Sequence, residues 1–210
     1  MSPPRWRRLA IAELRIAEGR ATVAGVDEAG RGPLAGPVVA AAVVLDLSAR
    51  WTGMDDSKQL TPQQREDLYA RVLSRARAFS WAVAGPRMIE MVNIRRATHA
   101  ALARAVRGLR VQPEMVLVDG HETVDEIRQE QRAVISGDAR CLSIAAASVL
   151  AKVVRDRIMQ RLDRVWPAYG FAQHKGYSTP EHLAALRTHG PCPAHRFTFA
   201  PVHELELPLV

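Results

Sequence analysis

The sequence predicts a single mixed α/β domain whose sheet begins with an antiparallel pair of strands. The 210 residues suit one domain with a core of its own. Apolar runs of strand length at 22–26 and 38–45 flank a turn rich in Gly and Pro. Helical and strand-like segments alternate after them, and no internal repeat or linker divides the chain. These observations favour a sheet that is antiparallel at its start.

The first two helices are predicted from their pattern and their caps. Residues 1–20 are expected to form a short amphipathic helix. The next helix should begin after Thr61, because Thr61 can serve as the N-cap, Pro62 suits the first helical position and Gln64 completes a capping box. This helix is expected to end near residue 77.

The remaining helices are predicted from their period and from Gly and Pro at their ends. One long helix is expected over about 86–108, and a second over 141–166, where Pro167 stops it. Ser178 and Glu181 have capping-box spacing, so a further helix should begin there and end near residue 190, before an irregular tail. Three short apolar runs predict the other strands: 79–84, 115–118 and 132–135.

Acidic residues stand at the ends of several of these strands. Asp27 and Glu28 follow the first strand, Asp119 follows the run at 115–118, and Asp138 comes soon after the run at 132–135. An ordinary turn explains each of them alone, because turns favour Asp and Gly. If they converge, however, they repel one another unless a cation is present. Carboxylate oxygens without His or Cys suit Mg²⁺ or Mn²⁺.

Positive charge is concentrated in one part of the chain. The formal net charge is +7, and the window 71–112 contains nine arginines against a single acid, Glu90. On the predicted helix, arginines 96, 104, 107 and 110 fall within about a third of the circumference. A basic face favours a polyanionic partner such as nucleic acid, and a merely solvated helix face is the alternative.

Composition excludes several other classes of protein. The two cysteines, Cys141 and Cys192, provide neither a disulfide framework nor metal-ligand spacing. The first 20 residues have no signal-peptide core, and the longest apolar run, at 38–45, is far shorter than the roughly 18 residues of a membrane helix. Aromatic residues make up only 5% of the chain, too few for the stacking platforms of a single-strand-binding module. We expect a soluble cytoplasmic protein.

One stretch, GVDEAGRGPLAGPVVAAA at 25–42, resembles the signature of type 2 ribonuclease H, or ribonuclease HII. Further motifs follow in the family's order: Asp56-Ser57-Lys58, Val118-Asp119-Gly120, Gly137-Asp138, the run from Ser143 to Lys152 with Arg155-Asp156, His174-Lys175-Gly176-Tyr177 and His195-Arg196. The resemblance covers about 24–202. It implies a ribonuclease H-like fold, a central mixed five-stranded sheet flanked by helices. It also implies a single catalytic domain over 1–210, with a C-terminal helical extension packed on it from about 170.

The resemblance implies an endonuclease that cuts the RNA strand of RNA–DNA hybrids. It also implies incision on the 5′ side of single ribonucleotides embedded in duplex DNA, which leaves a 3′-hydroxyl and a 5′-phosphate. Carried over by motif, the metal ligands are Asp27, Glu28, Asp119 and Asp138, which would hold two Mg²⁺ or Mn²⁺ ions when substrate is bound. The near alternatives are type 3 ribonuclease H and a non-catalytic hybrid-binding protein on the same fold.

Selectivity for RNA requires recognition of the 2′-hydroxyl. The resemblance assigns this to the backbone of Gly30, Arg31 and Gly32, helped by Tyr177. Three lysines are expected either to contact phosphates or to be merely solvated: Lys58, Lys152 and Lys175. His174 could assist catalysis or be structural, and His121 departs from the Asn that is more usual in the family. The C-terminus shows no sliding-clamp motif, and we expect a monomer.

Overall fold

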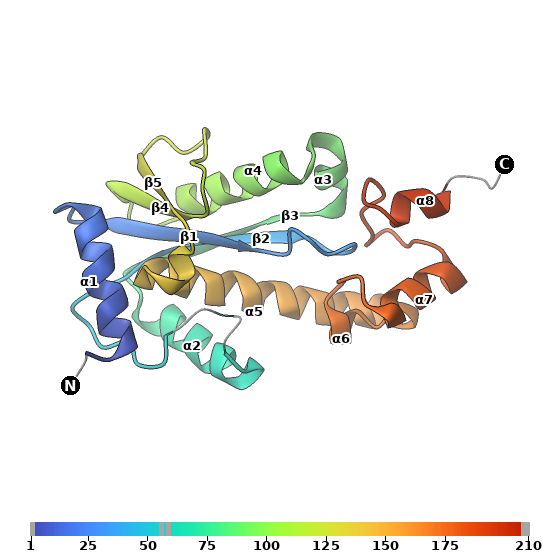
Figure 1. Ribbon diagram of the computed structural model, residues 1–210, viewed down its shortest axis with the longest axis horizontal. Coiled ribbons are helices and arrows are strands. Elements are labelled where there is room, and N and C mark those ends of the chain that lie inside the picture. The colour runs from blue at the N-terminus through green and yellow to red at the C-terminus, as the bar shows by residue number, and fades with distance from the viewer. Residues whose placement is uncertain (1–2, 55–56, 58–59, 207–210) are drawn as a thin grey trace.

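A mixed five-stranded sheet forms the centre of the computed structural model, which describes residues 3–54, 57 and 60–206 (Figure 1). The strand order is β3-β2-β1-β4-β5, in which β2 is antiparallel to both neighbours and β4 is parallel to both of its own. This confirms the mixed sheet and its antiparallel start. The strands are β1 (Val23–Ala29), β2 (Val38–Val44), β3 (Ala78–Ala84), β4 (Met115–Asp119) and β5 (Glu130–Val134).

Helices cover both faces of the sheet. Helix α4 (Ile94–Arg107) packs on one face, and the long α5 (Leu142–Val165) packs on the other with α2 (Pro62–Arg75) beside it (Figure 1). Strand β2 is buried along its whole length and supplies alternate side chains to the two apolar layers. Val39, Ala41 and Val43 belong to the layer under α5, and Val38, Ala40, Ala42 and Val44 to the layer under α4.

Helix α1 (Arg5–Ala17) is joined to the start of α5 by a buried acid. Glu13 is 1% exposed, and its carboxylate accepts hydrogen bonds from the Ser143 backbone N–H (2.8 Å) and hydroxyl (2.6 Å). An acid is favourable at this position because the first N–H groups of a helix lack partners within it. The amphipathic helix predicted for residues 1–20 is therefore part of the folded domain.

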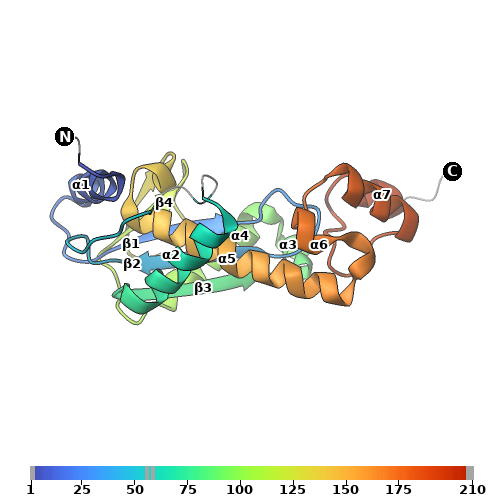
Figure 2. The ribbon, with the colours of Figure 1, turned by 90° about the horizontal axis from the view of Figure 1, so that it is seen from below.

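The chain after α5 forms a group of short helices at the far end of that helix from α1 (Figure 2). These are η2 (Pro167–Tyr169), α6 (Phe171–His174), α7 (Pro180–His189) and α8 (Val202–Glu206). The group has its own apolar cluster, which includes Phe171 and Leu186. It returns to the Gly-rich turn between β1 and β2, because the Leu34 N–H donates to the Gly176 carbonyl and the Gly36 N–H to that of Ala194, both at 2.8 Å.

Several element boundaries differ from the prediction. The helix expected over 86–108 is divided into α3 (Pro86–Val92) and α4. Asn93 between them has a φ of 69°, and its side chain accepts a hydrogen bond from the Arg96 N–H, so it caps α4. The N-cap of α7 is Thr179 and not Ser178, because Thr179 accepts from the His182 N–H. The tail expected to be irregular contains α8. The capping box that begins α2 is confirmed.

Part of the arginine-rich face secures α4 to the edge of the sheet. Arg104 donates to the Val83 carbonyl (3.2 Å), and Arg110 donates to the Arg77 carbonyl (2.8 Å). These two side chains hold α4 and the segment after it against β3. A role for Arg96 and Arg107 in binding nucleic acid stays a prediction.

Candidate metal centre and substrate cleft

Three of the four acids singled out in the sequence lie together at one edge of the sheet. Asp27, Asp119 and Asp138 each offer a carboxylate oxygen, and these oxygens all lie within 4.8 Å of one another. Asp27 and Asp138 are buried, and Asp119 is half-buried. No other such group of His, Cys, Asp or Glu was found among the described residues.

The parallel pairing of β1 and β4 positions the first two acids. Their register ends at the pair Val26 and Val118, so Asp27 and Asp119 come next, where the two strands separate. Ligand sites are common at the carboxyl ends of parallel strands for this reason. The prediction that Asp27 and Asp119 converge is thus confirmed.

Asp138 reaches the pair through a tight turn after β5. It lies in the short helix η1 (Gly137–Ala139), and the Gly137 N–H donates to Asp119 Oδ1 at 2.7 Å. A Cβ on Gly137 would lie 3.1 Å from that same oxygen and 2.6 Å from Ile144 Cδ1. A glycine at 137 therefore allows Asp138 to approach the other two carboxylates.

The prediction that β1 ends before its acids is wrong. Antiparallel pairing with β2 continues to the pair Ala29 and Val39, so Asp27 and Glu28 both lie inside the strand. Glu28 is outside the set of three converging carboxylates and forms an ion pair with Arg31 at 3.3 Å. It nevertheless lines the same cavity as Asp27 and Asp119.

The negative charges of this cluster destabilise one another. Burial raises the pKa of Asp27 well above its usual value, and the nearby Glu28 and Asp119 raise it further. Hydrogen bonds from Ser148 and from the Glu28 N–H oppose this shift. Burial also raises the pKa of Glu28, whereas Arg31 lowers it. A bound cation would relieve both the burial cost and the repulsion.

A cavity of about 210 Å³ opens beside the acids on the α5 side of the sheet. Its lining joins the acids to the Gly-rich turn and to the C-terminal group of helices: Asp27, Glu28, Ala29, Gly30, Ser57, Asp119, Ser148, Lys152, Arg155 and Tyr177. Tyr177 is 47% exposed, unusual for a large aromatic side chain. The structure therefore brings acids, turn and tyrosine to one cleft.

The predicted lysines are placed differently from one another. Lys152 lines the cleft and forms an ion pair with Asp156 at 2.7 Å. Lys175 lines a neighbouring groove between α2 and α5 and donates to the Ala172 carbonyl, and burial lowers its pKa. Lys58 lies outside the described residues.

His174 has a structural role. Its Nε2 lies 2.7 Å from the Tyr169 carbonyl oxygen, and its Nδ1 accepts from the Gly176 N–H at 3.1 Å. Both ring nitrogens are thus used within the C-terminal group of helices. Of the two roles left open for this residue, the hydrogen bonds favour the structural one.

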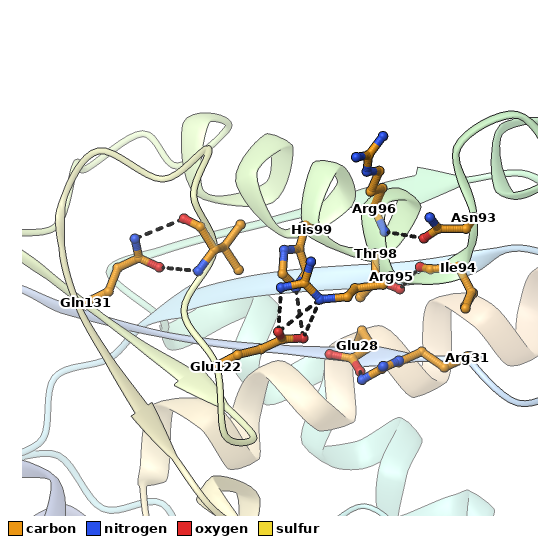
Figure 3. A network of polar contacts seen from close by, with 11 residues as sticks. Glu28, Arg31, Asn93, Ile94, Arg95, Arg96, Thr98, His99, Glu122 and Gln131 are labelled. Atoms are coloured by element: carbon orange, nitrogen blue, oxygen red, sulfur yellow. Dashed lines mark hydrogen bonds and ion pairs between the residues drawn. The ribbon is translucent and has the colours of Figure 1, made fainter.

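The loop that follows Asp119 is held against α4 by a polar network (Figure 3). Glu122 accepts hydrogen bonds from Arg95 (2.6 Å) and faces His99 Nε2 at 3.2 Å. The hydrogen bond from Arg95 lowers the pKa of Glu122 to about 2. His121, the residue that departs from the family pattern, lines a small cavity here that also includes Glu28 and Asp119.

Sequence reasoning gave no role to two histidines that secure the backbone of Tyr177. The Tyr177 carbonyl can only accept, so His182 Nδ1 donates to it at 2.9 Å. His182 Nε2 then accepts from His195 Nε2 at 3.0 Å, and His195 Nδ1 accepts from the Cys192 N–H at 3.0 Å. Burial lowers the pKa of both imidazoles, that of His195 to about 4, so the pair is neutral at pH 7.

A buried cluster of carboxylates on a mixed α/β sheet, next to an open cleft, is typical of hydrolases that cleave phosphodiester bonds with the help of metal ions. Among the described residues, no helix is long and apolar enough to cross a membrane. The comparisons with known proteins agree with this class of enzyme.

The family model described as "Ribonuclease HII" matches residues 24–202. A ribonuclease HII of Xanthobacter autotrophicus is 54% identical over 193 residues, 92% of this chain and 77% of the relative. The crystal structure of ribonuclease H2 from Pyrococcus horikoshii is similar with a TM-score of 0.78 at 29% identity, covering 88% of this chain and 97% of that one. Bst-RNase HIII in complex with Mn²⁺ shares the fold, with a TM-score of 0.68 at 20% identity, over 94% of this chain and 71% of that one.

The chain therefore belongs to the ribonuclease HII family. It is an endoribonuclease of RNA–DNA hybrids, which hydrolyses phosphodiester bonds. The family model that matches is that of type 2, which decides against the type 3 alternative.

Proposed function

We propose that the chain also incises duplex DNA on the 5′ side of a single embedded ribonucleotide, by a two-metal-ion hydrolysis that leaves a 3′-hydroxyl and a 5′-phosphate. The observation that supports this most directly is the convergence of Asp27, Asp119 and Asp138 within 4.8 Å beside a cleft lined by Gly30 and Tyr177. One chain supplies all of these residues, so we infer that a monomer is sufficient.

We assign the binding of Mg²⁺ or Mn²⁺ to Asp27, Glu28, Asp119 and Asp138. The donor atoms are carboxylate oxygens, which these hard ions prefer over nitrogen or sulfur. The raised pKa of Asp27 supports the assignment, because it reflects crowded negative charge that a cation would neutralise. When bound, two such ions supply an activated water and stabilise the charge on the leaving oxygen.

The other residues of the cleft would bind and orient the substrate. The backbone at 30–32 would hydrogen-bond to the 2′-hydroxyl, the group that distinguishes RNA from DNA. The exposed ring of Tyr177 would stack on the neighbouring sugar. Lys152 and Lys175, with Lys58, would contact phosphates as point charges.

The test is cleavage of an end-labelled DNA duplex that contains one ribonucleotide, in Mg²⁺ and separately in Mn²⁺. We expect a single incision on the 5′ side of the ribonucleotide, which Asp27→Asn abolishes without loss of the fold. Asp125→Asn is the matched control, because Asp125 is an exposed acid outside the cleft. Normal turnover by Asp27→Asn would refute the assignment. Tight binding of this duplex without cleavage in either metal would refute incision at a single ribonucleotide.

A further inference from the structure

Arg196 is buried directly behind the turn at 30–32. Its exposed fraction is 0%, and its three donor nitrogens all bond to carbonyls of the segment between β1 and β2. Nη2 donates to the Gly30 carbonyl (2.5 Å), Nη1 to that of Arg31 (2.8 Å) and Nε to that of Gly36 (3.0 Å). The Arg196 backbone N–H also donates to the Leu34 carbonyl at 2.8 Å. Backbone and side chain therefore both attach Arg196 to this segment.

The burial of this cation is energetically costly. Among the described residues, Arg196 has no carboxylate within ion-pair distance, and neither has Arg155, which is 1% exposed. Burial lowers the pKa of Arg196 to about 9, and the positive charge of Arg155 contributes. Buried cations normally have an acidic partner, because desolvation is expensive without one. Here backbone carbonyls and the ring of Phe199 replace water around the Arg196 guanidinium.

Two of the three carbonyls that the Arg196 side chain binds, those of Gly30 and Arg31, belong to peptides whose N–H groups face outward. The Gly30 carbonyl shares its peptide unit with the Arg31 N–H, and the Arg31 carbonyl shares its unit with the Gly32 N–H. Arg31 and Gly32 are exposed, and among the described residues neither N–H makes a hydrogen bond. A charge-assisted hydrogen bond to a carbonyl polarises the peptide and strengthens its N–H as a donor.

Arg155 provides a contrast within the same structure. It donates to the Pro37 carbonyl (3.0 Å) and to the Ala35 carbonyl (3.2 Å). The N–H groups of those peptides belong to Gly36, which is already bonded to Ala194, and to Val38, which is the first residue of β2. Arg155 therefore fixes the segment but does not act on the two open N–H groups.

We propose that Arg196 is a positioning residue for ribonucleotide recognition. It fixes and polarises two consecutive peptides so that the Arg31 and Gly32 N–H groups donate to the 2′-hydroxyl oxygen. This inference rests on the proposed function, which assigns the turn at 30–32 to that hydroxyl. Paired outward N–H groups of this kind form a concave site for electronegative atoms.

The test measures discrimination in binding, with no cleavage involved. In protein carrying Asp27→Asn, fluorescence anisotropy gives the Kd for a duplex with one ribonucleotide and for the same duplex entirely of DNA. Arg196→Lys keeps the cation but loses the planar fork that reaches three carbonyls. We expect Arg196→Lys to raise the Kd for the ribonucleotide duplex about tenfold and to leave the Kd for the DNA duplex unchanged. The ratio of the Kd for the DNA duplex to the Kd for the ribonucleotide duplex should therefore fall about tenfold.

Phe199→Leu is the matched control. The Phe199 ring lies 5.1 Å from the Arg196 guanidinium, and no hydrogen bond joins its side chain to the turn. Phe199→Leu should be less stable than the parent, but it should show the same ratio of the Kd for the DNA duplex to the Kd for the ribonucleotide duplex. If Arg196→Lys keeps the ratio, or if both variants reduce the two affinities equally, the proposal is overturned. A parent protein that binds both duplexes equally would instead refute the proposed function.

A second measurement does not depend on the folding of any Arg196 variant. In protein with Asp27→Asn alone, the amide proton resonances of Arg31 and Gly32 should shift downfield on adding the ribonucleotide duplex and not on adding the DNA duplex. Equal shifts with both duplexes would contradict donation to the 2′-hydroxyl.

Discussion

Strand β1 and helix α5 pack tightly against each other at Gly25, and we expect Gly25→Ala to disrupt the centre of the domain. A Cβ at this position would lie 2.2 Å from the Ile144 backbone nitrogen and 2.3 Å from the Ser143 carbonyl carbon. Ordinary contacts begin at 3.4 Å, so the shortfall is 3.4 − 2.2 = 1.2 Å. Both atoms belong to the first turn of α5 and cannot rotate away.

The size of the effect follows from this geometry. Inserting one methyl group into a packed core costs about 1–3 kcal/mol where side chains can adjust, and more where they cannot. Here the strand or the helix must move by about 1 Å, so we expect a loss of about 3 kcal/mol or more. Asp27 lies two residues along the same strand, so cleavage activity should fall as well. The free energy of unfolding is measured by urea titration with circular dichroism.

Gly32→Ala is the matched control for this prediction. A Cβ on Gly32 would meet no atom within 4 Å. Its free energy of unfolding should stay within about 1 kcal/mol of the parent, because Gly to Ala at a compatible position is neutral or slightly stabilising. Its cleavage of a ribonucleotide duplex should still fall, since the methyl group would stand where the sugar approaches. If the free energy of unfolding of Gly25→Ala lies within 1 kcal/mol of that of the parent, the packing argument is refuted.

Three further predictions concern the buried polar groups. Burial lowers the pKa of His195 in the folded protein to about 4, compared with an ordinary value of 6.5. As the pH falls below 6.5, the imidazole is therefore protonated in the unfolded chain before it is protonated in the folded protein. Stability should therefore fall by up to about 3 kcal/mol between pH 6.5 and 4, and urea titrations of His195→Asn should show a shallower slope over that range. Glu13→Ala leaves the Ser143 N–H and hydroxyl without their acceptor and should lower the free energy of unfolding by about 1–3 kcal/mol; an unchanged urea midpoint would contradict this. Mn²⁺ at a hundred times its Kd should raise the free energy of unfolding by about 2.7 kcal/mol. Asp119→Asn should remove most of this stabilisation. A Tm that does not change when Mn²⁺ is added would argue against the metal site.

Much of the acid cluster could be predicted from local sequence, because strand ends are marked by strong signals. An apolar run followed by Asp and Gly predicted the position of Asp119 at the end of β4. The length of β1 could not be predicted, because residues 27–29 are held in the strand by pairing with β2 on one side only. Similarly, Asn93 looks like any polar residue within a helical pattern, and only its capping of α4 reveals the break.

The glycines of the turn between β1 and β2 show that one residue type can be required for different reasons. A Cβ on Gly30 would lie 2.0 Å from Arg155 Nε, and one on Gly36 would lie 2.3 Å from Met159 Sδ. These two glycines are required by the packing of α5 under the turn. Only Gly32, among the glycines of this turn, faces open space in the described structure. A sequence cannot separate these cases, since both demand the same residue.

The burial of Arg196 was the hardest feature to foresee, and it bears on how the domain is organised. Arginine is rarely buried without an acid, so composition and pattern place it at the surface. In the structure it joins the C-terminal group of helices to the turn that borders the acids, while His182 of the same group fixes Tyr177. The sheet supplies the carboxylates, and the C-terminal residues shape the groups that would contact the sugar. We therefore infer that the extension from about residue 170 is an integral part of a single catalytic domain, since without it the cleft would keep its acids but lose the contacts that order the turn.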